Sequence, residues 1–336
     1  MSQEICPVLM NYLFFRMGRQ MKKALVLSGG SIKGAFQAGV LAELLSSGSF
    51  EPEAIYGTSV GSLNGAFLAE RAGRAAAAGV KPNWLEIGNQ LQDFWLQQVN
   101  SFSKIGRKRG IFSLLVSLIS KNFRSFLDMS PLDELLKQEI KLENLEKSPV
   151  KFYACAVNIR SGEPVYATVD SHRQTMHDYI MASTAIPLVM PLRFIQKEPY
   201  VDGGIREVAP LSQAIKDGAT QIICVICQPR VLSPRQSGWK NAVELMERDM
   251  DIVTNETVNN DVDQCMEINE LLKQFPQLTA AGPLQGKRQI DLLEIRPAAA
   301  IELELENFDS DQIRQALKQG WETSRQARQN CAWLKA

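Results

Sequence analysis

The chain has 336 residues, of which 45% are hydrophobic and 22% are charged, and this composition is typical of globular proteins. The 37 lysines and arginines balance the 37 aspartates and glutamates, so no overall positive charge attracts nucleic acid and no nucleic-acid partner is expected. The six cysteines, spread over so long a chain, favour reduced thiols and a cytoplasmic location over a disulfide framework.

Residues 1–20 precede the first convincing strand. They carry an acidic residue at position 4 and lack the basic start of a signal peptide. No stretch of the sequence approaches the roughly 18 consecutive apolar residues of a membrane span. We therefore expect a disordered N-terminal extension over 1–20 and a soluble protein, for which peripheral membrane contact is still open.

Two strand–loop–helix units then follow in succession. "KALVLSGG" predicts a buried strand over 24–28, and "GAFQAGVLAELLSSG" has its apolar residues at helical spacing. "AIYG" and "GSLNGAFLAERAG" repeat this order of elements. Two such units predict an α/β fold of three layers, in which helices cover a central, mostly parallel sheet.

The later part of the chain continues without a linker or an internal repeat. "KFYACAVNIRSGEPVYATV" predicts a hairpin with strands around 152–157 and 165–169, and "GATQIICVIC" and "IDLLEIRP" predict two more strands. The pattern is mostly helical from residue 241 on, and the final helix is expected to begin at a capping serine, Ser310. We expect an α/β core over 21–235 and a mostly helical part, 236–336, of the same domain.

Two further segments allow more than one interpretation. Cys224 and Cys227 have the spacing of a redox motif, but odd spacing in a strand points the sulfurs to opposite faces, which favours buried core cysteines. Segment 101–127 wraps basic residues around an apolar stretch, without an acid. It fits the surface of an anionic membrane or a lid over an apolar substrate, and equally a core-packing helix with a solvated basic end. Its basic residues are Lys104, Arg107, Lys108, Arg109, Lys121 and Arg124.

The stretch "GTSVGSLNGA" contains the G-x-S-x-G pattern of serine hydrolases, formed by Gly57, Ser59 and Gly61. Glycines on both sides suit the sharp strand-to-helix turn of a nucleophile elbow, and the following helix points backbone N–H groups at the hydroxyl. The pattern is short, and glycines here also allow close helix packing. The predicted strand before and helix after the serine favour a nucleophile.

A serine nucleophile needs a base, and the chain has only two histidines, His172 and His177. Asp133 or Asp170 precedes them as the acid of a Ser-His-Asp triad would, but both histidines lie in the approach to a helix. Asp202 in "PYVDGGIREVAP" follows a short strand and precedes two glycines. A partly desolvated carboxylate there accepts a serine proton, although D-G-G is also an ordinary turn sequence.

The loop "SGGSIKG" over 28–34 is neither a Walker A loop nor a dinucleotide fingerprint. It offers backbone N–H groups at a helix N-terminus, and one lysine, Lys33. This is suitable chemistry for an oxyanion hole.

Taken in order, "GGSIKG", "GTSVG", "ASTAIP" and "DGG" resemble the motifs of the patatin-like phospholipase family, from about Lys23 through Pro229. The resemblance implies a bacterial-type lipid acyl hydrolase with Ser59 as nucleophile and Asp202 as base, and without a catalytic histidine. Two positions depart from the family pattern: Ser31 stands where a third glycine is usual, and Arg206-Glu207 follows D-G-G where an asparagine is common. The implied oxyanion hole consists of Gly29, Gly30 and Ser31, and the supporting motif residues are Lys33, Gly34, Gly57, Gly61, Gly203 and Gly204.

The activity that the resemblance implies is hydrolysis of fatty acyl esters of phospholipids or related lipids through an acyl-enzyme, with no cofactor and no metal. Segment 101–127 is then expected to be a lid that faces lipid and contacts the membrane surface. Two alternatives stay open: an α/β-hydrolase esterase that uses His172 or His177, and a catalytically weak relative that binds lipid. The sequence carries no signal for an oligomeric state.

Overall fold

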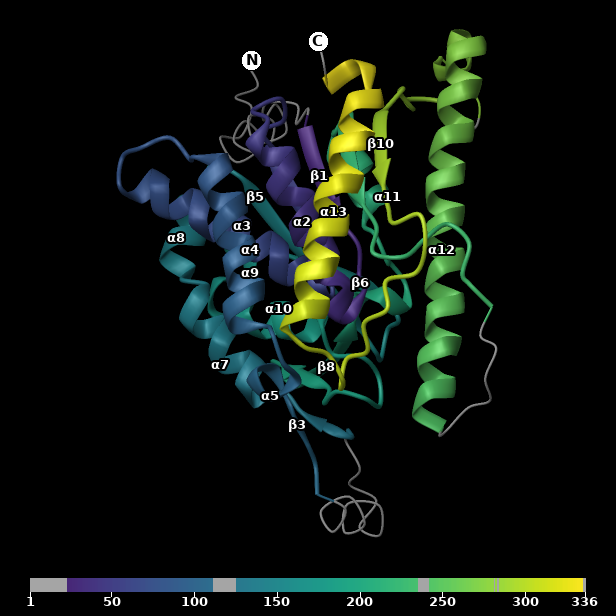
Figure 1. The fold of residues 1–336 in the computed structure, drawn as a ribbon. Coiled ribbons are helices and arrows are strands. Elements are labelled where there is room, and N and C mark those ends of the chain that lie inside the picture. The colour runs from purple at the N-terminus through teal and green to yellow at the C-terminus, as the bar shows by residue number, and fades with distance from the viewer. Residues whose placement is uncertain (1–22, 111–124, 235–241, 281, 283, 335–336) are drawn as a thin grey trace, which may run out of the picture.

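The computed structural model describes residues 23–110, 125–234, 242–280, 282 and 284–334 (Figure 1). The expected extension over 1–20 lies outside the described residues, as does 111–124, the middle of the expected lid.

One large sheet forms the centre of the described chain, with its strands in the order β10-β9-β1-β2-β5-β8-β7 and with β6 also paired to β5. The first five of these run parallel, whereas β6 and β8 run antiparallel to β5, and β7 runs antiparallel to β8. The strand bounds are Lys23–Leu27 (β1), Ala54–Thr58 (β2), Lys151–Asn158 (β5), Pro164–Ala167 (β6), Arg193–Ile195 (β7), Glu198–Asp202 (β8), Gln221–Val225 (β9) and Asp291–Ile295 (β10). A separate pair joins β3 (Arg107–Lys108) to β4 (Leu127–Asp128).

Helices cover both faces of this sheet (Figure 1). The α-helices are α2 (Gly34–Ser46), α3 (Val60–Ala77), α4 (Trp84–Gln98), α5 (Phe102–Ile105), α7 (Ser130–Glu139), α8 (Leu142–Lys147), α9 (Val169–His172), α10 (Met176–Ser183), α11 (Leu211–Lys216), α12 (Ala242–Gln274) and α13 (Ser310–Asn330). Short 3-10 helices span Ser31–Lys33, Arg173–Thr175, Gly203–Ile205, Pro276–Thr279 and Ala332–Leu334.

The alternation of side chains along β1 separates two hydrophobic cores. Leu25 and Leu27 point into the larger core, which is shared with α2, α3, α4, α7, α10 and α13. Ala24 and Val26 point into the smaller core, which is shared with α11 and α12. Because successive residues of a strand face opposite sides, one strand serves both cores and fixes a three-layer α/β architecture.

The expected strand–loop–helix units and the expected hairpin are confirmed. β1 and β2 are parallel neighbours, each followed by a helix, and β5 and β6 form an antiparallel pair. The expected cysteine positions are also confirmed, since Cys224 lies in the smaller core and Cys227 in the larger one. Burial raises the pKa of both thiols, which disfavours the reactive thiolate.

The expected cap of the last helix is wrong. The side chain of Asp309, not that of Ser310, accepts hydrogen bonds from the N–H groups of Asp311 and Gln312, and Gln312 completes a capping box. Ser310 is the first residue of α13 itself. The helix dipole also favours a carboxylate at the cap, so Asp309 is preferred to the neighbouring Ser310 as the capping residue.

Candidate active site

Ser59 is the single residue between β2 and α3, and its backbone is strained. Its φ is 54° and its ψ is −125°, a conformation that residues other than glycine rarely adopt. Such a conformation costs on the order of 1–3 kcal/mol and persists only where the surrounding structure enforces it. A strained serine between a buried strand and a helix is the geometry of a nucleophile elbow.

The two glycines of the pattern are required by close backbone contacts. A Cβ atom on Gly57 would lie 2.4 Å from the carbonyl oxygen of Gly61, and one on Gly61 would lie 2.2 Å from that of Leu27. Real Cβ atoms do not approach so closely, so the turn around Ser59 excludes any larger residue at either position.

The pairing on β5 explains why Asp202 lies next to Ser59. Thr58, the last residue of β2, pairs with Cys155, and Asp202, the last residue of β8, pairs with Ala156. Cys155 and Ala156 both pair with β6 as well, and a strand has only two edges, so β2 and β8 share the edge opposite β6. The two strands therefore meet end to end, which brings the nucleophile elbow to the D-G-G turn.

Asp202 is a buried carboxylate, with 6% of its surface exposed. Burial raises its pKa to about 7, against the lowering effects of hydrogen bonding with Ser59 and with the N–H group of Gly204. The Gly204 N–H group donates to Asp202 Oδ1 at 2.7 Å. A carboxylate with a pKa near neutrality is matched to proton transfer at neutral pH.

The segment "ASTAIP" forms hydrogen bonds with both Ser59 and Asp202, a role that the sequence analysis missed. Ser183 Oγ accepts a hydrogen bond from the Ser59 N–H group at 2.9 Å and donates to the carbonyl oxygen of Cys155 at 2.5 Å. The carbonyl oxygen of Ala185 accepts from the Asp202 N–H group at 3.0 Å. The motif was visible in the sequence, but only the fold shows which atoms it binds.

The loop that precedes α2 lies against Ser59. A Cβ atom on Gly29 would lie 3.3 Å from Ser59 Cβ. The Gly29 N–H group donates to the carbonyl oxygen of Val208 at 2.8 Å, so it is occupied. Within the described residues, the N–H groups of Gly30 and Ser31 have no acceptor, which makes them the donors available for an oxyanion.

Ser31 and the residues after D-G-G were the two departures from the family pattern. Ser31 has a φ of 52°, in the left-handed region where glycine is at ease, which explains why a glycine suits this position. After D-G-G, the carbonyl oxygens of Glu207 and Val208 hold the Thr58 hydroxyl, at 2.7 Å, and the Gly29 N–H group. These contacts use backbone atoms, so they do not depend on the side chains at 206 and 207.

Buried polar side chains form hydrogen bonds with both ends of the same loop, 28–34. Gln37 Nε2 lies 3.4 Å from the carbonyl oxygen of Ser28, and Asn64 Nδ2 donates to the Gly34 carbonyl oxygen at 3.1 Å. Asn64 also accepts from Trp95 Nε1 at 2.9 Å and donates to Gln37 Oε1 at 3.0 Å. Both ends of the loop are thereby fixed to α2, α3 and α4.

Lys33 takes part in a contact outside this loop. Its Nζ pairs with Asp251 Oδ1 of α12 at 3.4 Å. The predicted basic position therefore ties the loop to the helix on the other face of the sheet.

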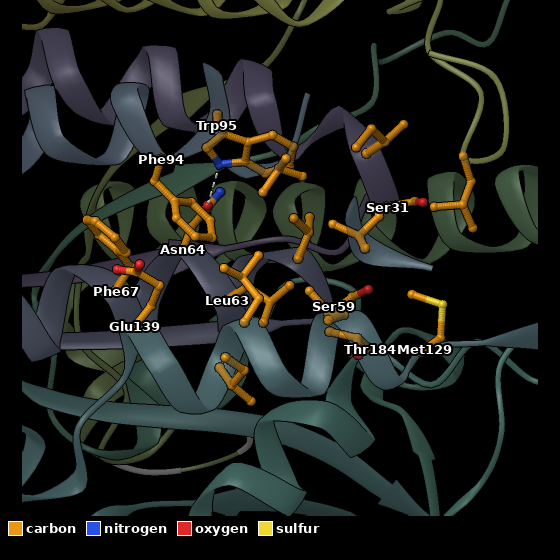
Figure 2. Close-up of a pocket in the computed structure, with 18 of the residues that line it drawn as sticks. Ser31, Ser59, Leu63, Asn64, Phe67, Phe94, Trp95, Met129, Glu139 and Thr184 are labelled. Atoms are coloured by element: carbon orange, nitrogen blue, oxygen red, sulfur yellow. Dashed lines mark hydrogen bonds between the residues drawn. The ribbon is translucent and has the colours of Figure 1, made fainter. Parts of the chain in front are cut away.

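Ser59 and Ser31 open onto a cavity whose walls are almost wholly apolar (Figure 2). Its walls come from α3, α4, α7 and the "ASTAIP" segment, which contributes Thr184 and Ile186. Such an apolar lining is typical of a site that binds an apolar ligand. Other wall residues are Val60, Leu63, Phe67, Phe94, Val99, Met129, Leu132 and Leu136.

Neither histidine lines this cavity. His177 Nε2 is hydrogen-bonded to the carbonyl oxygen of Ile140 at 2.8 Å, and His172 packs edge-on against the ring of Tyr179. Within the described ranges, no group of three or more histidine, cysteine or carboxylate side chains is placed to hold a metal ion.

Comparison with known proteins identifies the family of this chain. The model of the patatin-like phospholipases matches residues 25–215, which contain all four motifs. The uncharacterized protein YjjU of Escherichia coli (strain K12) is 28% identical over 214 residues, or 61% of this chain and 52% of YjjU, so the chain spans about half the length of that relative. The crystal structure of VipD from Legionella pneumophila aligns with 93% of this chain and 67% of its own, at a TM-score of 0.41 and 13% identity.

The family model covers more than half of the chain, including the elbow, the D-G-G turn and the loop before α2. The chain therefore belongs to the patatin-like phospholipase family.

Proposed function

We propose that this protein hydrolyses fatty acyl esters of phospholipids or related lipids with a Ser59–Asp202 dyad. The observation that carries the proposal is the end-to-end meeting of β2 and β8 on β5, beside an apolar cavity. The pairing supports direct proton transfer between the two side chains, and the cavity supports an acyl chain as the group bound next to them.

The proposed reaction has two balanced steps. Asp202 accepts the Ser59 proton as Oγ attacks the ester carbonyl carbon, and the N–H groups of Gly30 and Ser31 hold the resulting oxyanion. The carbon–oxygen bond to the alcohol then breaks, and the alcohol leaves with the proton from Asp202. Water, deprotonated by Asp202, attacks the acyl-enzyme, and the fatty acid leaves as Ser59 regains its proton.

The test is a fatty-acid release assay over phospholipids, lysophospholipids, acylglycerols and p-nitrophenyl esters. We expect turnover by the wild type, and a loss of about 10²–10⁴-fold in Asp202→Asn, because general-base catalysis contributes on that scale. A double variant, His172→Ala with His177→Ala, should keep its activity.

Two results would contradict the proposal. Loss of turnover in the double histidine variant would favour an α/β-hydrolase esterase. A folded wild-type protein that binds lipid but releases no fatty acid would favour a lipid-binding relative.

We further propose that the protein works in the cytoplasm, at a membrane surface beside this cavity. The N–H group of Arg109 donates to the carbonyl oxygen of Phe126, and that of Phe126 donates to Leu188, both at 3.2 Å. Leu188 is 55% exposed and Phe126 is 37% exposed, and β3 adds two exposed basic residues. Apolar side chains next to cations suit an anionic bilayer. The five described cysteines are free thiols, in keeping with a reducing compartment.

Binding to phospholipid vesicles tests this contact. None of the helices in the described ranges combines the length and apolar character needed to cross a membrane. Leu188→Asp should reduce co-sedimentation with anionic phospholipid vesicles, whereas Val80→Asp, an equally exposed apolar position, should not. Equal sedimentation of the two variants would refute the contact.

A further inference from the structure

The cavity extends from the nucleophile along one face of α3. Val60, Leu63, Asn64 and Phe67 line it, at positions i, i+3, i+4 and i+7 of the helix, which share one face. In Figure 2, Phe67 lies at one end of the row of lining residues, and Ser59 lies between it and Met129. A chain attached to Ser59 would therefore extend along the helix towards Phe67.

Two phenylalanines from different helices meet at the far end. The rings of Phe67 on α3 and Phe94 on α4 are 5.2 Å apart between centroids, and both line the cavity. The guanidinium group of Arg71 lies over the Phe67 ring, 4.1 Å from its centroid. Arg71 thus packs on this ring and helps to fix it.

Arg71 belongs to a charged cluster next to Phe67, and one member of this cluster, Glu139, itself lines the cavity. Its Nη2 pairs with Glu139 at 2.5 Å, its Nη1 donates to the Glu139 carbonyl oxygen at 3.0 Å, and it also pairs with Glu70. Glu70 is fully buried and accepts a hydrogen bond from Asn144 at 2.5 Å. A methylene group of an acyl chain that entered this cluster would separate ion pairs that are shielded from water. It would contact charged groups instead of apolar side chains.

The distance from the nucleophile to this end fits a chain of limited length. Ser59 and Phe67 are eight residues apart, which is about 12 Å along an α-helix. A staggered carbon chain with bonds of about 1.52 Å and angles of about 111° advances about 1.25 Å per bond. About ten carbons therefore span the distance.

We propose that the site selects medium acyl chains of about ten carbons, and that Phe67 and Phe94 set this limit. Arg71 acts as a positioning residue, since its contacts with Glu139 and the Phe67 ring hold the end wall. This inference rests on the proposed acyl hydrolase function, because it assumes that the chain starts at Ser59.

The test compares kcat/KM for p-nitrophenyl butyrate, octanoate, decanoate and palmitate in the wild type and in Phe94→Ala. Phe94 is only partly buried, so its truncation leaves the core of α3 in place. We expect the wild type to favour decanoate over palmitate by about tenfold or more. Phe94→Ala should lower that ratio about tenfold, since room for two more methylenes is worth roughly that factor. Phe194→Ala, an exposed phenylalanine outside the cavity, should leave the ratio unchanged.

A binding measurement separates this inference from the proposed function. Calorimetry of decanoate and palmitate with Ser59→Ala measures chain selection without turnover, and adding Phe94→Ala should improve palmitate affinity at least about fivefold. A preference for palmitate in the parent variant, or equal ratios with and without Phe94, would overturn the chain limit even if the enzyme is active. Selective binding without any turnover by the wild type would instead overturn the hydrolase function.

Discussion

At the scale of single residues, the charge on Asp202 decides the pH dependence of the proposed reaction. With a pKa raised by burial to about 7, the carboxylate is half-charged near neutral pH, and only the charged form accepts a proton. We expect kcat/KM to rise about tenfold per pH unit below this pKa and to level off above it. Hydrolysis of p-nitrophenyl octanoate between pH 5 and 9 measures this. A rate that is independent of pH over this range would contradict the role of Asp202.

The same burial predicts that Asp202 destabilises the protein above neutral pH. The pKa is raised from 3.8 to about 7, so between these values the unfolded chain loses its proton while the folded protein keeps it. Stability therefore falls as the pH rises through this window, by as much as roughly 4 kcal/mol, and the loss is complete above the folded-state pKa.

Asp202→Asn removes this titration. We expect the variant to melt several degrees above the wild type at pH 8, and the difference to shrink at pH 5, where the wild-type carboxyl is protonated in the folded state. Scanning calorimetry at both pH values checks this difference, with Asp311→Asn, at an exposed position in the first turn of α13, as control. An equal difference at the two pH values would show that the folded-state pKa is not raised.

Ser183 is expected to position the nucleophile without touching substrate. Ser183→Ala leaves the Ser59 N–H group and the Cys155 carbonyl oxygen without their partner, at a cost of about 1–3 kcal/mol in stability. Because the strained elbow loses an anchor, kcat should fall at least about tenfold, with KM little changed. Ser161→Ala in an exposed turn is the matched control. Wild-type kcat in Ser183→Ala would rule out the positioning role.

The residues proposed for the site could be predicted from the sequence, but most of their hydrogen-bond partners could not. Ser59 and Asp202 could be proposed because short motifs between strands and helices carry them. The roles of Ser183 and Asn64, and the occupied N–H group of Gly29, could not, because their partners are 27 to 179 residues away in the chain. Such pairs depend on tertiary packing, for which a single sequence has no local signal.

At the scale of elements, the strands were easier to predict than the way they meet. Apolar runs and turn residues predicted β1, β2, the β5–β6 hairpin, β9 and β10. The sharing of one edge of β5 by β2 and β8 follows from register, which short strands do not specify by themselves. The cap at Asp309 shows the same limit on a smaller scale, since element boundaries depend on which of two neighbouring side chains reaches the helix N–H groups.

The packing of α13 on α2 allows a test of the predicted C-terminal part, 236–336. A Cβ atom on Gly320 would lie 2.0 Å from the carbonyl oxygen of Phe36, so Gly320→Ala must push the two helices apart. We expect a loss of about 1–3 kcal/mol, beyond the small gain in helix propensity, measured by urea unfolding. Gly110→Ala, where a Cβ has nothing within 4 Å, is the control. Equal stability of the two variants would argue that α13 is not required by the core.

At the scale of the whole molecule, the region of the family match packs against the part of the chain that follows it. The matched region, 25–215, contains the elbow and the D-G-G turn, while β9 and β10 extend its sheet and Lys33 binds Asp251 on α12. The large core joins α13 to α2 and α3. The division into a core over 21–235 and a helical part of the same domain stays a prediction, which the Gly320 variant addresses.

The central claim, that Ser59 is a nucleophile activated by Asp202, is tested most directly by labelling with a fluorophosphonate probe followed by peptide mapping. We expect one labelled peptide that contains Ser59, no label in Ser59→Ala, and strongly slowed labelling in Asp202→Asn, since the probe reacts with an activated serine. A folded wild-type protein that takes up no label, or label that persists in Ser59→Ala, would contradict the claim.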